Sequence, residues 1–123
     1  MPGGWDSPLG QRVEPGVLAP TPENAEFALS LVREMMENVT SRRINIGCDE
    51  TFELGRGKSR AEVEQRGRAR VYLDHLKRLL AGLHEDDCEV LFWGDMVREH
   101  PDLVAELPKE RTVALAWWYE APV

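Results

Sequence analysis

The spacing of apolar residues along this chain distinguishes the predicted helices from the predicted strands. Between residues 25 and 39 they recur every three or four positions, as in an amphipathic helix, and Thr21-Pro22-Glu23 has the residue types of a helix start. A second helical stripe runs from residue 69 to residue 83, after Ser59-Arg60-Ala61-Glu62, which has the form of a capping box. A short third helix is expected over residues 99–107.

Three short segments rich in β-branched and aromatic residues lie between these helices and predict strands at about 43–49, 88–94 and 112–118. Strands that alternate with helices form βαβ units, so we expect a parallel sheet in an α/β fold. Residues 1–22 are dense in proline and glycine and are interpreted as a loop.

Composition and charge narrow the class of protein. The chain has 123 residues, enough for one domain or part of one, and its formal charge of −7 argues against nucleic acid as a partner. It has no apolar run of the ~20 residues that a membrane span needs and no signal-peptide pattern, so we expect no membrane partner and a cytoplasmic location. The two cysteines lack metal-ligand spacing, and we expect no metal.

Acidic and aromatic residues follow each predicted strand: Asp49-Glu50, then Trp93-Gly94-Asp95, then Trp117-Trp118-Tyr119-Glu120. Ligands of parallel α/β folds bind at these carboxyl ends of the strands. Carboxylates beside flat aromatic faces suit a carbohydrate, because sugar rings pack on aromatic rings and a carboxyl group can protonate a glycosidic oxygen. The alternative is that the acids are solvated strand ends and the tryptophans belong to the core.

Three motifs in order resemble glycoside hydrolase family 20, the β-N-acetylhexosaminidases. The segment from Ile44 to Thr51 resembles the H-x-G-G-D-E signature of that family, and residues 92–96 and 116–120 resemble the motifs on its next two strands. The resemblance implies an incomplete (β/α)8 TIM barrel in which residues 23–123 supply about the third helix to the sixth strand. Asn45 and Cys48 depart from the signature, where the family has His and the second Gly.

The resemblance also implies roles for residues. Glu50 would be the general acid and then the general base, and Asp49 would orient the 2-acetamido group, whose oxygen attacks the anomeric carbon in substrate-assisted catalysis. The implied substrate is a carbohydrate containing N-acetylhexosamine, and no cofactor is expected. The remaining candidates would wall the pocket or lie at its rim: Trp93, Asp95, and Trp117 or Trp118.

A full barrel takes about 250 residues, so the missing strands would come from the rest of a longer chain or from a partner, and this chain alone would be inactive. Two other hypotheses remain open. One is a non-catalytic, sugar-binding barrel remnant. The other is a doubly wound α/β domain of another function, in which Asp49-Glu50 is a solvated strand end.

Overall fold

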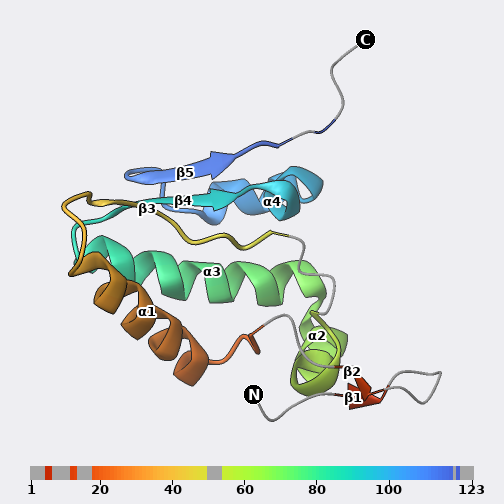
Figure 1. Ribbon diagram of the computed structural model, residues 1–123. Helices are drawn as coiled ribbons and strands as arrows, with labels where there is room; N and C mark the ends of the chain where they lie inside the picture. Colours follow the sequence, from red (N-terminus) through yellow and green to blue (C-terminus); the bar gives the residue numbers. More distant parts are fainter. Residues whose placement is uncertain (1–4, 7–11, 14–17, 50–53, 118, 120–123) are drawn as a thin grey trace.

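A three-stranded parallel sheet lies along one side of the molecule, at the top of Figure 1, with helices packed beneath it. The computed structural model describes residues 5–6, 12–13, 18–49, 54–117 and 119. The strand order is β3-β4-β5, and both neighbouring pairs are parallel. The predicted mixed α/β architecture with three parallel strands is therefore confirmed.

The strands lie where they are predicted but are shorter: β3 spans Arg43–Asn45, β4 Glu89–Trp93 and β5 Thr112–Leu115. The first was expected to run to residue 49. It ends early because Gly47 and Cys48 have φ angles of 75° and 68°, which an extended strand excludes. Cross-strand pairing continues past its end, since the amide of Ile46 donates to the carbonyl of Leu91 at 2.9 Å.

Helix α1 (Pro22–Met36) begins as the sequence predicts. The Thr21 side chain accepts a hydrogen bond from the amide of Asn24 at 3.2 Å, and Pro22 occupies the first helical position, where its missing N–H costs nothing. The buried residues Ala25, Leu29 and Met36 form its inner face.

The second predicted helix is divided into three pieces. They are the 3-10 turn η1 (Gly57–Ser59), α2 (Arg60–Arg66) and α3 (Arg68–Glu85), with Gly67 at a φ of 85° between the last two. The expected capping box does not form. The hydroxyl of Ser59 instead donates to the carbonyl of Arg56 at 3.0 Å and accepts from the amide of Gly55 at 2.9 Å.

The third predicted helix is also divided, into α4 (Asp95–Glu99) and the 3-10 helix η2 (Pro101–Glu106). Helix α4 therefore begins four residues before the predicted start at residue 99. The division falls at Pro101, which lacks the amide needed to continue α4.

Early in the chain, within the segment interpreted as a loop, β1 (Trp5–Asp6) and β2 (Arg12–Val13) form a short antiparallel pair.

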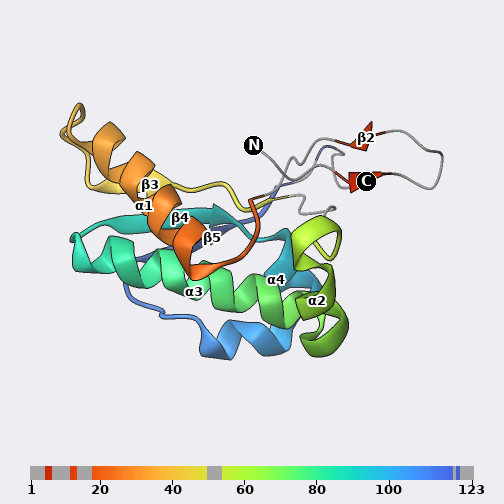
Figure 2. The same cartoon turned by 90° about the horizontal axis from the view of Figure 1, so that it is seen from below.

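The core lies between the sheet and the helices on one of its faces (Figures 1 and 2). Val90 and Phe92 of β4 are fully buried there against α3, which presents Leu73, Leu76 and Leu80. Helix α1 packs in turn on α3.

The opposite face of the sheet is only partly covered within the described residues. Asn45 and Val113 are exposed there, and Leu91, Trp93 and Leu115 are half-buried. These residues share one face because they lie at matched positions of neighbouring parallel strands.

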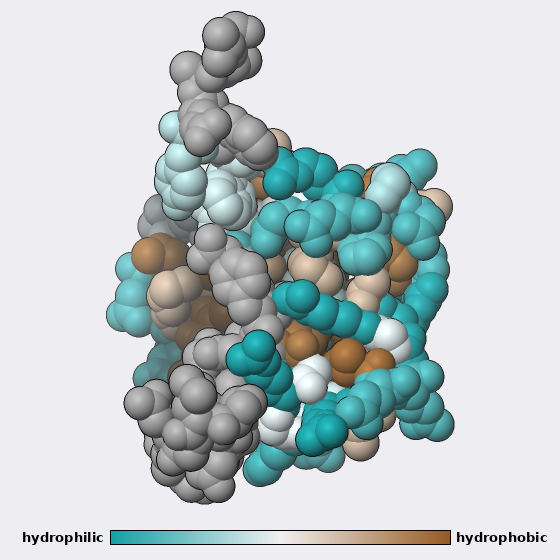
Figure 3. Space-filling model, turned by 90° about the vertical axis from the view of Figure 1, so that its right-hand side faces the viewer, coloured by the Kyte–Doolittle hydropathy of each residue, from teal (hydrophilic) through white to brown (hydrophobic). Residues whose placement is uncertain are grey.

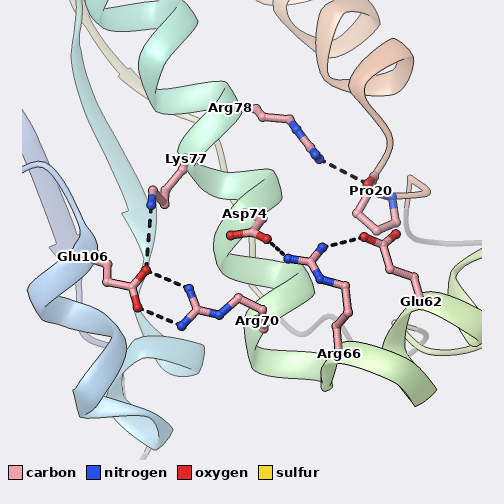
Figure 4. Close-up of polar contacts among 8 residues, drawn as sticks. All are labelled: Pro20, Glu62, Arg66, Arg70, Asp74, Lys77, Arg78 and Glu106. Carbon is pink, nitrogen blue, oxygen red and sulfur yellow. Dashed lines mark hydrogen bonds and ion pairs between the residues drawn. The ribbon is translucent and has the colours of Figure 1, made fainter.

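Ion pairs fix α3 to its neighbours on the outside of the molecule (Figure 4). Arg70 bonds both carboxylate oxygens of Glu106 in η2, at 2.7 and 2.8 Å, and this bidentate contact holds the pKa of Glu106 below its usual value. Arg66 bonds Glu62 of α2 and Asp74 of α3.

No helix among the described residues is long and apolar enough to cross a membrane.

Candidate functional site

The three strand ends meet at one edge of the sheet, as the parallel arrangement predicts. The amide of Trp93 donates to the carbonyl of Gly47, and the amide of Gly94 donates to the carbonyl of Leu115, both at 2.8 Å. These two bonds connect the turn after β3 and the last residue of β5 to the end of β4. Residues that follow the three strands are therefore brought together although they lie far apart in the sequence.

The structure describes four of the six candidate residues. Asp49 is exposed after β3, Trp93 is the half-buried last residue of β4, Asp95 is the half-buried first residue of α4, and Trp117 is half-buried after β5. The candidate acid/base Glu50 and the aromatic Trp118 lie outside the described residues.

The turn that carries Asp49 is built from two consecutive left-handed residues, Gly47 and Cys48. The amide of Gly47 donates to the side-chain oxygen of Asn45 at 2.9 Å, which closes the turn on its own strand. The hydroxyl of Tyr72, from α3, donates to the carbonyl oxygen of Cys48, also at 2.9 Å. Asp49 therefore follows directly after a backbone segment held from two directions.

Sequence reasoning placed Tyr72 among the apolar residues of its helix and missed its polar contact. One signal was available, because a buried tyrosine hydroxyl usually finds a hydrogen-bond partner, and Tyr72 stands among aliphatic residues on the buried face of α3. The stripe could not reveal the identity of that partner, which lies 24 positions earlier in the chain.

The negative charges of Asp49 and Asp95 both contribute to raising the pKa values of Cys48 and Tyr72. Burial, together with these two negative charges, raises the pKa of Cys48 to about 12. Burial also raises the pKa of Tyr72, with smaller contributions from Cys48, Asp95 and Asp49. The raised pKa favours the protonated thiol of Cys48 at neutral pH.

A groove of about 400 Å³ lies beside β5, and its lining includes Asp95, Val97, Val104 and Trp117. Asp49 and Trp93 are not among the residues that line it. The described candidates thus fall into two groups, with Asp95 and Trp117 on the groove and Asp49 and Trp93 at the neighbouring strand ends.

Two of the aromatic side chains after β5, those of Trp117 and Tyr119, lie next to each other. The rings of Trp117 and Tyr119 have centroids 5.2 Å apart and planes inclined at 58°, and Tyr119 is 92% exposed. Figure 3 shows the molecule from the side toward which β4 and β5 point, where hydrophobic side chains reach the surface between hydrophilic ones. An exposed aromatic ring such as that of Tyr119 can pack against the apolar face of a sugar ring.

No group of three or more histidine, cysteine or acidic residues that could hold a metal ion occurs in the described part of the chain. The chemistry available in that part comes from carboxylates and aromatic rings at the carboxyl edge of a parallel sheet. The fold is mixed α/β with a parallel sheet, and in such folds ligands bind at the carboxyl edge of the sheet.

Comparison with known proteins adds one relative. The chain is similar to human Hexosaminidase D, with 30% identity over 112 residues that cover 81% of this chain and 23% of the human protein. The chain thus spans about a quarter of the length of that relative. No family model matches the chain. The similarity supports a hexosaminidase-like relationship.

Proposed function

We propose that this chain is part of a retaining β-N-acetylhexosaminidase of the glycoside hydrolase family 20 type, which hydrolyses terminal N-acetyl-β-hexosaminides. The observation that carries the proposal is the meeting of the turn before Asp49 with the ends of β4 and β5, where Trp93 and Trp117 lie. The similarity to a hexosaminidase supports the same activity.

In the proposed reaction the substrate supplies the nucleophile. Asp49 orients the 2-acetamido group, whose carbonyl oxygen attacks the anomeric carbon while Glu50 protonates the departing glycosidic oxygen. Water then opens the resulting oxazoline, with Glu50 accepting its proton. This scheme needs one acid and one orienting carboxylate, so adjacent acids suffice.

The aromatic residues Trp93 and Trp117, or Trp118, would enclose the sugar ring and the acetamido methyl group, with Asp95 at the rim. The proposal includes a complete (β/α)8 barrel, whose remaining strands come from a longer chain or a partner. The half-exposed second face of the sheet supports this, because the interior of a closed barrel is filled with packed side chains. Residues 1–123 by themselves would then be inactive.

The test uses the complete native protein and chromogenic N-acetyl-β-glucosaminides and N-acetyl-β-galactosaminides. Glu50→Gln should lower kcat on the order of 10²-fold or more, because an amide cannot donate the proton. Asp49→Asn should lower it as well, and a β-glucoside without the acetamido group should not be hydrolysed.

The matched control is Glu85→Gln, which makes the same change at the exposed carboxyl end of α3 and should leave kcat unchanged. Full activity in Glu50→Gln would refute the proposal.

A second candidate function is sugar binding without catalysis, favoured by the exposed ring of Tyr119 next to the half-buried Trp117. Calorimetric titration of the complete protein with N-acetylglucosamine separates the two candidates. Binding in a protein that hydrolyses none of the substrates supports the binding module, and turnover excludes it. Binding that is unaffected by Asp49→Ala would instead indicate that this carboxylate is a solvated strand end.

A further inference from the structure

The backbone before the candidate acid pair adopts a conformation that its own residues do not favour. Cys48 has a φ of 68°, a left-handed value that a residue with a Cβ rarely adopts. Such a conformation persists only where surrounding contacts hold it. Two hydrogen bonds reach this turn from other elements: the Trp93 amide donates to the Gly47 carbonyl at 2.8 Å, and the Tyr72 hydroxyl donates to the carbonyl of Cys48 itself at 2.9 Å.

Tyr72 is well placed to hold this carbonyl. Its side chain is 5% exposed, and it lies near the start of α3 beside the fully buried Leu73. Helix α3 in turn packs on β4. The position of the Tyr72 hydroxyl is therefore set by the core of the protein.

We propose that Tyr72 is a positioning residue for the candidate acid pair. By bonding the Cys48 carbonyl it keeps Cys48 left-handed, and this conformation sets the direction in which the chain continues into Asp49. The inference rests on the proposed hexosaminidase function and adds a residue of α3 to its site. The mechanism is geometric, since a rotation at Cys48 displaces the Asp49 carboxylate that follows it.

The first experiment is steady-state kinetics of Tyr72→Phe in the complete native protein. This variant keeps the ring and removes only the hydroxyl. We expect kcat to fall by roughly 10-fold or more while KM changes by less than about 2-fold, because the reacting groups are misplaced and the aromatic walls are not.

Thr112→Val is the matched control, because it also removes a single hydroxyl, which lies 3.2 Å from His84 Nε2 and donates to the carbonyl of Glu110 at 3.3 Å, at the amino end of β5. It should lower the melting temperature without lowering kcat. A general loss of stability is thereby separated from a loss of positioning.

A double variant tests the mechanism. Glycine adopts a positive φ without strain, so Cys48→Gly should make the turn less dependent on Tyr72. We expect the fold-loss in kcat caused by Tyr72→Phe to be several-fold smaller in the Cys48→Gly background. Equal losses in both backgrounds would contradict a role that acts through the conformation of Cys48.

Thiol labelling provides a readout that needs no activity. Cys48 lies in the turn and Cys88, 1% exposed, lies just before β4 at the other end of the sheet. Tyr72→Phe should raise the labelling rate of Cys48 by iodoacetamide several-fold and leave that of Cys88 unchanged. The inference is overturned if both cysteines label faster together, or if the kinetics of Tyr72→Phe match those of Thr112→Val. The activity of Glu50→Gln decides the proposed function separately.

Discussion

At the scale of single residues, Cys48 combines an unfavourable backbone conformation with a well-packed side chain. Its φ of 68° lies in the region where glycine is favoured, and the signature that this segment resembles has its second glycine at this position. The half-buried side chain packs against the hydrophobic core, and the thiol approaches the carbonyl of Ile46 at 3.7 Å. Packing thus compensates for part of the strain.

The effect of a substitution at Cys48 on the stability of the protein should therefore depend more on how well the new residue adopts a positive φ than on its hydrophobicity. Cys48→Val should destabilise the protein by roughly 1–2 kcal/mol, because a β-branched side chain fits this conformation poorly. Cys48→Gly should change stability by less than about 1 kcal/mol, since relief of strain offsets the lost packing. Thermal unfolding of the complete protein measures both variants. A valine variant as stable as the glycine variant would contradict the explanation.

At the scale of elements, α1 and α3 approach closely at Gly82. A Cβ atom at this glycine would lie 2.5 Å from Cδ1 of Leu29, which is shorter than atoms in contact allow. Leu29 is 2% exposed, so its side chain has little room to move aside. The absence of a side chain at Gly82 therefore sets the distance between these two helices.

Gly82→Ala tests this packing. Alanine favours a helix by about 1 kcal/mol over glycine, but overpacking a core costs roughly 1–3 kcal/mol, so we expect a net loss of stability. In the Leu29→Ala background the clash is absent, and the same substitution should become stabilising. Thermal melts of the two single variants and the double variant measure this coupling, and equal effects of Gly82→Ala in both backgrounds would exclude the clash.

At the scale of the whole molecule, apolar surface remains uncovered in the described part of the chain. Phe27, Leu31 and Met35 are spaced four residues apart on α1, and their exposed fractions are 52%, 51% and 51%. β3 and β5 are the outer strands of the parallel sheet, and its second face is half-exposed. Such surface is typical of contact sites for further structure.

The isolated 123-residue chain should therefore self-associate. Leu31→Gln combined with Met35→Gln should lower the associated fraction measured by size-exclusion chromatography with light scattering, because both side chains belong to the exposed stripe of α1. Glu26→Gln, a change at an exposed polar position of the same helix, serves as the control and should not lower it. A monomer with a sharp, reversible melt would contradict the expectation.

The local pattern of residues determined most of the fold. Helical and strand periodicity placed three parallel strands between helices, and Thr21-Pro22 marked the start of α1 within one residue. These features follow from neighbours in the sequence, which is why they could be predicted. The division of the second helix at Gly67 was missed because a single glycine inside an apolar stripe is often tolerated in a helix.

The candidate site was determined only in part by the sequence. Strand ends identified Asp49, Trp93, Asp95 and Trp117, because parallel strands bring their carboxyl ends to one edge. Only the tertiary structure decided that Tyr72 bonds the carbonyl of Cys48 and that Asp95 and Trp117, without Asp49, share a groove. These contacts depend on how α3 and α4 pack against the sheet. Packing brings together residues that lie far apart in the sequence, and no local sequence pattern indicates such pairs.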